Sequence, residues 1–323
     1  MAYDLYELNV GLSGLEYNDD RTEVVIKMFV EEGDRYIVER LDLVGMTTLN
    51  AEEILRESSL QEGQPYRMFD VVRTLQSIEE AYRRLGYLDV SVRREETLRL
   101  ESEGVHLVLS VEEGIQKRIR DVHIQGNLMT RDDVVRRYIT LYQGDVADVE
   151  KLRYNESELR SEGFFTSLTG APLLEMNFKG TPDPGLVDLI VDVGEEESGL
   201  FTFMVAAGSY SGLFGGISIE KRNFDLERTP TSWNNFFREF FGTSEAFHGG
   251  GQRLRFLIAP GTDTTEVDLS FEDPWLDPGD EHSWGVSTEL YNRHRYFSDY
   301  ERRRTGFGLF FNKRLSRKER ITV

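Results

Sequence analysis

The spacing of apolar residues changes along the chain near Gly199. Before that residue, apolar positions at steps of two are interspersed with stretches that step by three and four, which predicts short strands mixed with helices. After it, apolar residues recur almost entirely at steps of two, which predicts a succession of strands. We therefore expect two structurally different parts, and 323 residues suffice for several domains.

The first part contains a unit that recurs after about eighty residues. Val30-Glu31-Glu32-Gly33 returns as Val111-Glu112-Glu113-Gly114, and Gly45 returns as Gly126, each after 81 residues. A period of this length indicates small domains arranged in tandem.

The complete copy of this unit predicts the order strand, helix, helix, strand, strand. Asn50 and Glu53 form a capping box that opens a helix at Ala51. The other elements are expected as a strand at 36–44, a helix with the apolar stripe Val71, Leu75, Ile78, Tyr82 and Leu85, and strands at 89–94 and 105–111.

The second copy predicts the same order. Its elements are a strand at 118–125, a helix capped by Thr130 that carries Val135, Tyr138 and Ile139, a helix that carries Val149, Leu152 and Leu159, and strands near 173–178 and 186–193. Residues 3–30 hold two strand-like runs, 5–12 and 22–30, which we interpret as the tail of a third copy whose front is missing.

This unit resembles the POTRA domain family. The resemblance rests on the order of elements, the glycine after the first strand, Gly86-Tyr87 or Gly163-Phe164 after the second helix, and the Val-Glu-Glu-Gly ending. It implies that the middle strand lies at the edge of a small mixed sheet, where unfolded client chains add to it. An exposed edge offers unpaired backbone groups that bind any extended chain. The expected client-binding edges are 89–94 and 173–178, with Val90, Val92, Arg94, Leu174, Met176 and Phe178. The alternative is that these strands are only structural.

The second part separates apolar from polar residues strand by strand. Thr265, Val267, Leu269 and Phe271 point one way, and Glu266, Asp268, Ser270 and Glu272 the other; 201–205, 253–258, 284–290 and 307–311 alternate similarly. Strands with lipid on one side and water on the other have this pattern. If the third and fourth strands pair, Arg253 and Arg255 share the inner face with Glu266, Asp268 and Glu272, as ion pairs. A soluble β-sandwich also alternates and stays an alternative.

Four stretches of this part are similar to the opening strands of BamA-type outer-membrane assembly factors: Gly199–Phe203, Gly208–Gly216, Arg222-Asn223-Phe224 and Phe271–Leu276. The resemblance implies POTRA repeats (β-α-α-β-β, an α+β fold) followed by an incomplete antiparallel transmembrane β-barrel. About six strands are expected here, where the family has sixteen. The expected domains are the C-terminal part of a truncated POTRA domain at 1–33, POTRA domains at 34–114 and 115–197, and the barrel portion at 198–323.

The function implied by this resemblance is the assembly of outer-membrane proteins. Unfolded β-barrel precursors would bind the POTRA edges and enter lipid at a seam formed by the first barrel strand, with Phe201, Phe203, Val205 and Ala207. Accessory assembly lipoproteins and the lipid bilayer are the other expected partners, in the cell outer membrane with periplasmic POTRA domains. The alternatives are a two-partner secretion translocator, or a soluble periplasmic scaffold.

One stretch departs from the family pattern. Trp233, Phe236, Phe237, Phe240 and Phe241 fall at helical spacing between a cap at Thr231 or Ser232 and Gly242. We interpret it as a short helix lying in the membrane interface beside the first strands. The alternative is that this helix packs against a POTRA domain or the barrel mouth.

Charge and composition exclude several other classes of function. The net charge is −20, and residues 200–323 hold 16 Lys and Arg against 17 Asp and Glu, so the acidity lies mostly in the repeats and no nucleic acid is expected as a partner. There is no cysteine for disulfides, and the five histidines lack metal-site spacing. We expect no enzyme, no catalytic residues, no cofactor and no metal.

Membrane insertion by a helix is not expected either. No run approaches the roughly 18 apolar residues of a membrane-spanning helix. The first residues include Asp4 and Glu7, where a signal peptide needs a basic start. The sequence alone therefore predicts either a cytoplasmic protein or a native beginning other than Met1.

Overall fold

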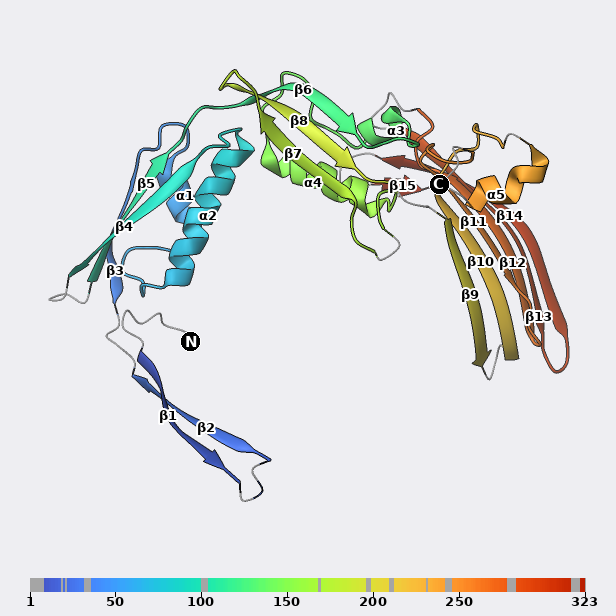
Figure 1. Ribbon diagram of the computed structural model, residues 1–323, viewed down its shortest axis with the longest axis horizontal. Helices are drawn as coiled ribbons and strands as arrows, with labels where there is room; N and C mark the ends of the chain where they lie inside the picture. The colour runs from blue at the N-terminus through green and yellow to red at the C-terminus, as the bar shows by residue number, and fades with distance from the viewer. Residues whose placement is uncertain are drawn as a thin grey trace. The chain divides into compact units, whose positions relative to one another are not determined.

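The computed structural model describes residues 9–18, 20, 22–31, 36–99, 104–167, 170–195, 199–208, 212–230, 232–241, 246–277, 283–314 and 320–322. These residues form four sheets, which Figure 1 shows in chain order. Two are three-stranded and belong to the two repeats, one is an isolated hairpin, and one is a C-terminal sheet of seven strands.

The N-terminal hairpin pairs β1 (Asn9–Tyr17) with β2 (Val24–Glu31) in antiparallel register. Two strands were expected here at 5–12 and 22–30, and positions 5–8 of that expectation lie outside the described residues. Large apolar side chains of both strands are exposed, with Leu12 61% and Met28 66% accessible.

The first repeat has the predicted order of elements: β3 (Ile37–Val44), α1 (Ala51–Glu57), α2 (Met68–Arg84), β4 (Ser91–Arg99) and β5 (Gly104–Glu112). The strands lie in the order β3-β5-β4, with β3 parallel and β4 antiparallel to β5. Figure 1 shows α2 running along this sheet. The apolar stripe of α2 includes Val71, Ile78 and Tyr82, which are fully buried in one core with Leu107 and Leu109 of β5. Asn50 caps the N-terminus of α1 as expected, because its side-chain oxygen accepts a hydrogen bond from the Glu52 amide at 2.9 Å.

The second repeat contains β6 (Arg118–Gln125), α3 (Asp132–Arg136), α4 (Val149–Ser161), β7 (Leu174–Gly180) and β8 (Leu186–Val193), with sheet order β6-β8-β7. The prediction that Thr130 caps the first helix is wrong. The helix α3 begins after Arg131 and ends at Arg136, before the expected Tyr138 and Ile139. The Thr130 amide donates to Glu195, and the Thr130 hydroxyl accepts a hydrogen bond from Asn223.

The glycine and glutamate of the sequence repeat meet in space in both copies. Gly45 and Gly126 adopt positive φ angles of 83° and 89°, and a Cβ on either would collide with the carbonyl of Val111 or Val193. The glutamate two residues beyond that valine then accepts amides from the loop after the glycine. Glu195 binds the Met129 and Thr130 amides, each at 2.7 Å.

Glu113 performs this role in the first repeat. It accepts the Thr47 amide at 2.5 Å, the Thr48 amide at 2.9 Å and the Tyr82 hydroxyl at 2.6 Å. Burial alone would raise the pKa of Glu113, but these hydrogen bonds outweigh it and lower the pKa to about 2. The carboxylate thus joins the end of the last strand to the loop before α1 and to α2.

We predict that Glu113→Ala lowers the free energy of unfolding of the first repeat by about 3 kcal/mol, because five donors, the amides and hydroxyls of Thr47 and Thr48 and the Tyr82 hydroxyl, lose a charged acceptor. The matched control is Glu112→Ala, whose exposed pair with Arg93 at 3.1 Å should contribute less than about 0.5 kcal/mol. Urea unfolding measures both variants, and hydrogen exchange at the Thr47 and Thr48 amides locates the change. Equal effects of the two substitutions would contradict the assignment.

The C-terminal part is a single antiparallel meander. Its strands are β9 (Gly199–Gly208), β10 (Gly212–Phe224), β11 (Gln252–Ala259), β12 (Thr264–Asp273), β13 (Trp284–Tyr296), β14 (Glu301–Arg314) and β15 (Arg320–Thr322), each paired with its chain neighbour. About six strands were expected, and the seventh, β15, has three residues. Over the described ranges no second sheet is stacked on this one, so the sandwich alternative is not observed. Among the same residues, no helix is both long and apolar enough to cross a bilayer.

Candidate functional site

Both predicted client-binding strands lie at sheet edges. Each three-stranded sheet has two outermost strands, β3 and β4 in the first repeat and β6 and β7 in the second, and within the described residues β4 pairs only with β5 and β7 only with β8. The side chains named for these edges largely face inward. Val90 precedes β4 and is buried, Val92 packs against the core, and Arg94 lies 3.3 Å from Glu96. On β7, Leu174 and Met176 are buried and Phe178 is half-buried. What these edges offer is therefore backbone rather than the predicted apolar side chains.

The predicted seam strand, β9, is also an edge. It pairs with β10 along its whole length, and no described strand pairs with its other side. Phe203 and Val205 are 73% and 82% accessible, Phe201 and Ala207 are exposed as well, and the rings of Phe201 and Phe203 stack at 5.8 Å. An exposed edge beside exposed apolar side chains can accept a further strand.

Cross-strand register gives the C-terminal sheet one apolar face. Residues opposite each other in an antiparallel pair point to the same side. Phe203 lies opposite Ile217, Ile217 opposite Ile258, and Ile258 opposite Val267, which makes a continuous apolar row across four strands. A second row runs from Leu269 through Leu290 to Phe307. We call this side of the sheet the apolar face.

The opposite, polar face carries ion pairs between neighbouring strands. Arg253 lies opposite Glu272 with 3.7 Å between their charged groups, as the sequence predicted, whereas Arg255 lies opposite Ser270. The largest cluster was not predicted: Arg293 of β13 contacts Glu266 at 2.7 Å and Asp268 at 3.1 Å, both on β12, and also Glu289. Sequence reasoning paired β11 with β12 and had no register for β13.

Most of the second repeat forms one compact unit with the C-terminal sheet. The contacts between them, which we call the junction, centre on Asn223 at the end of β10. Asn223 is 1% accessible, its amide nitrogen donates to the Thr130 hydroxyl at 2.7 Å, and its side-chain oxygen accepts the Gly251 amide at 2.9 Å. Its φ of 54° is in the left-handed region, which asparagine tolerates better than most residues.

Two arginines hold the loop after β10. Arg131 of the second repeat lies 3.0 Å from Glu227 and 3.8 Å from Asp225, and Arg228 donates to the Met129 carbonyl at 2.6 Å. Asp225 is 1% accessible and lies 3.7 Å from Arg228, so its buried charge has two guanidinium neighbours. These pairs fix the loop against the turn that precedes α3.

The segment His248–Gly251 lies directly against the backbone of the second repeat. Gly249 has a φ of 100°, and a Cβ there would lie 2.2 Å from the Met129 carbonyl oxygen. Its carbonyl accepts the Arg131 amide at 3.0 Å. The three consecutive glycines at 249–251 were the sequence signal for this close approach, and the sequence analysis did not use them.

Aromatic and charged contacts extend the junction to the turn after β12. The rings of Trp275 and Tyr138 meet edge to face at 5.7 Å, and the Arg137 guanidinium lies over both rings. Glu162 accepts from Arg253 at 2.7 Å. Trp275, which the sequence analysis noted only as part of a family motif, is buried here and contacts the second repeat.

The predicted helix after β10 is present in two short pieces. A 3₁₀ turn covers Trp233–Asn235, and α5 covers Phe236–Phe241. Phe240 is buried and Phe236 partly buried in a cluster with Phe224 and Phe247. The side chains of Trp233, Phe237 and Phe241, and the residue Gly242, lie outside the described part of the structure.

His248 makes the junction sensitive to pH. It is 4% accessible, and burial together with the positive charges of Lys221 and Arg228 lowers its pKa from 6.5 to about 4, against a smaller opposite effect of Glu195. An unfolded chain binds a proton at this histidine below about pH 6.5, whereas the folded chain does so only near pH 4. Folding stability from this group is complete above pH 6.5 and falls as the pH decreases.

We predict that the native protein loses about 2 kcal/mol more stability between pH 7 and pH 5 than the His248→Gln variant, since glutamine does not titrate. Unfolding in detergent at the two pH values measures the difference. His123→Gln, at a half-exposed histidine of the same unit, should keep the pH dependence of the native protein. An unchanged pH dependence in His248→Gln would show that His248 does not cause it.

Comparison with known proteins agrees with this architecture. The family model of the POTRA domain, described as a surface antigen variable number repeat, matches residues 36–114 and 117–196. The outer membrane protein assembly factor BamA of Neisseria meningitidis serogroup B is 26% identical over 265 residues, which cover 81% of this chain and 30% of that protein. BamA of Nitratidesulfovibrio vulgaris is 23% identical over 300 residues, which cover 90% of this chain and 33% of that protein. The chain thus spans about a third of the length of these curated relatives.

A solved structure shows the same fold. The crystal structure of BamA from Haemophilus ducreyi lacking POTRA domains 1–3 superposes with a TM-score of 0.65 at 20% identity. The match covers 86% of this chain and 47% of that one. Repeats followed by an antiparallel sheet that resembles part of a barrel are therefore the fold of this chain.

Proposed function

Because this chain belongs to the BamA-type family of outer-membrane protein assembly factors, we propose that it receives unfolded outer-membrane protein precursors at β4 and β7 and pairs them with β9. The repeats lie in the periplasm and the C-terminal sheet in the outer membrane, as in that family. The observation that carries the proposal is that, within the described residues, β9 pairs on one side only and carries exposed apolar side chains.

The bilayer gives this edge its chemical role. In hydrocarbon, each unpaired backbone amide or carbonyl costs several kcal/mol, since no water is present to bind it. A precursor strand that pairs with β9 satisfies both edges at once and places its own apolar residues next to Phe203 and Val205, in lipid. Both changes lower the free energy, so the insertion step needs no ATP.

The edges β4 and β7 suit an earlier step in water. Their inward side chains are used by the core, so an arriving chain meets mainly backbone groups. Backbone pairing is indifferent to sequence, which suits a receptor for many precursors. Water competes for the same groups, so each contact is weak and a precursor can leave for β9. The accessory assembly lipoproteins expected from the resemblance stay a prediction.

We predict that a cysteine placed at Thr202 or Met204 of β9 forms a disulfide with a precursor that carries a single cysteine in its terminal strand. Paired strands bring opposite Cβ atoms to about 5 Å, close to disulfide geometry. Residues 1–323 contain no native cysteine, so each variant has one thiol in this part of the protein. The measurement is the yield of the crosslinked product in membranes that hold the full-length protein.

Ser270→Cys on the polar face of β12 is the matched control, because this strand already has partners on both sides. Crosslinks at 202 and 204 with none at 270 support strand addition at the seam. Crosslinks at 270 alone would contradict it and would indicate a chain passing through the lumen, as in a secretion translocator.

The periplasmic step has its own test. A photoreactive residue at Glu95, exposed on β4, should crosslink to an unfolded precursor segment, whereas one at Gln76, exposed on α2 of the same repeat, should not. Edge pairing predicts this contrast, since the helix offers no free backbone groups. Equal yields at the two positions would mean that precursors do not select the edge.

A further inference from the structure

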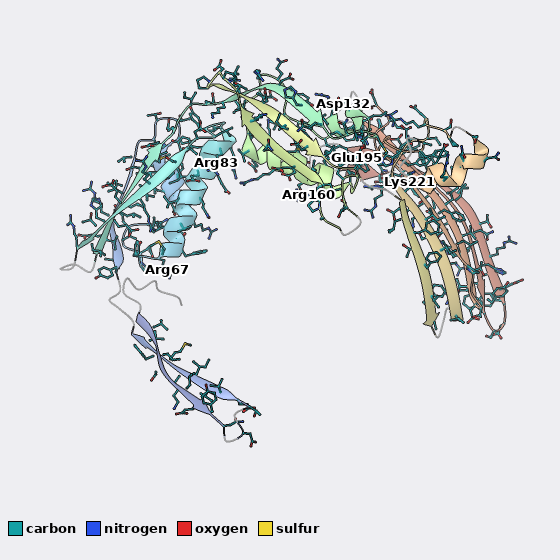
Figure 2. All side chains as sticks on the ribbon, viewed as in Figure 1. Arg67, Arg83, Asp132, Arg160, Glu195 and Lys221 are labelled. Atoms are coloured by element: carbon teal, nitrogen blue, oxygen red, sulfur yellow. The ribbon has the colours of Figure 1, made fainter. Side chains whose placement is uncertain are left out.

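A lysine lies on the apolar face of the C-terminal sheet. Ile217, Ile219 and Lys221 of β10 point to the same side, and Lys221 lies opposite Leu254, which in turn lies opposite Phe271. Lys221, labelled on β10 in Figure 2, is nevertheless only 2% accessible. A cation on the lipid side of a barrel is unfavourable unless it is covered or close to the interface.

The segment after β10 covers this lysine. The Lys221 ammonium donates to the Phe240 carbonyl at 2.6 Å and lies 5.0 Å from the centre of the Phe240 ring. The Phe240 ring stacks on the Phe236 ring, with 5.5 Å between the ring centres, and meets the Phe247 ring edge to face at 5.8 Å between centres. The cluster also packs against Ile219, Leu254 and Phe271. These three residues belong to the apolar face of β10, β11 and β12, so α5 lies outside the sheet rather than in its polar concavity.

The position along the strands places α5 at the membrane boundary. The turns after β9, β11 and β13 lie at one end of the meander. The connection from β10 to β11, which carries α5, lies at the other end, where β9 begins and the junction holds the second repeat. In the proposed orientation this is the periplasmic end. α5 exposes Arg238 and buries Phe240 together with Glu239, and an exposed cation beside buried aromatic rings suits the boundary between headgroups and hydrocarbon.

We propose that residues 232–241 form a membrane-interface element that contacts phospholipid headgroups of the periplasmic leaflet and is held to the apolar face of the sheet by Lys221. The inference rests on the proposed membrane insertion of the C-terminal sheet. Its consequence is local: β10 is the strand that pairs with β9, so the element fixes lipid contacts immediately beside the seam.

Lys313 shows what an uncovered lysine does on the same face. Lys313, on β14, lies opposite Trp284 of β13, and its ammonium is 5.1 Å from the centre of that indole ring. The Lys313 side chain is only half-buried. No covering helix is needed there, because a partly exposed side chain reaches polar surroundings by itself. Lys221 differs in being enclosed, which makes Lys313 a matched control for it.

The location is tested by a nitroxide attached to a single cysteine at Arg238 in the full-length protein in phospholipid vesicles. We expect this label to collide with a nickel chelate attached to lipid headgroups. Its collision rate should be well above that of a label at Glu95 of β4. A label at 238 with the same access to a water-soluble nickel complex as the label at 95, and no contact with the lipid-attached chelate, overturns the proposal.

A label at Leu269, on the apolar face of β12, separates this inference from the proposed function. Access of that label to oxygen dissolved in lipid reports insertion of the sheet. If the label at 269 is in lipid and the label at 238 is in water, only the interface element is refuted. If the label at 269 is in water, the membrane function itself fails.

The holding role of Lys221 is tested with Lys221→Met, which keeps the chain length and removes the ammonium. We expect trypsin to cleave after Arg238 about tenfold faster, the factor for loss of a hydrogen bond to a charged group. Lys313→Met should leave this rate unchanged. Heat-modifiable migration in gels verifies that each variant is folded. If Lys221→Met misfolds, nitroxide mobility at 238 is compared between the native protein and Phe240→Leu, which removes the ring contact. An unchanged rate and mobility would refute the holding role.

Discussion

The requirement that every backbone amide and carbonyl find a partner governs this molecule. Each sheet satisfies its interior strands and leaves its outer strands with unpaired groups. In the repeats the outer strands are β3 and β4, and β6 and β7, where water can bind the unpaired groups. In the C-terminal sheet the outer strands are β15 and β9, and for β9 the apolar face predicts a surrounding without water. Under the proposed function, the same geometry would give weak binding at β4 and β7 and strong binding at β9.

The junction determines where that strong edge is presented. Asn223 ends β10 and binds Thr130, so the second repeat is bonded to the strand that pairs with β9. Several of its donors and acceptors are buried, including Asp225 and His248, and such groups cost free energy whenever the contact opens. Under the proposed function, the edges of β7 and β9 are thus connected by a network of buried hydrogen bonds and ion pairs rather than by a flexible linker.

Local signals were enough for the sequence to predict the repeats. The 81-residue period, the stripe on α2 and the Asn50 cap each depend on residues close in the chain, and the structure confirms them. Threonine is a residue type that often caps helices, but the assignment of Thr130 as a helix cap is wrong. Its hydrogen-bond partners, Asn223 and Glu195, lie 93 and 65 residues away in the sequence. The alternation of β12 likewise predicted its two faces, but the Arg293 cluster required the register of β13. The alternation of apolar and polar residues predicts which face of the sheet a side chain occupies. The residue it contacts on a neighbouring strand is known only from the fold.

The connection between β10 and β11 joins the two environments of the protein. Its beginning and end, Asn223 and His248–Gly251, bond to the second repeat, and its middle, α5, packs on the apolar face. Lys221 and Asn223 lie two residues apart near the end of β10, where the pairing with β11 shifts register, and they bind α5 and the repeat, respectively. A displacement of either contact changes β10 directly. Because β10 is the described partner of β9, both contacts lie one strand away from the proposed seam.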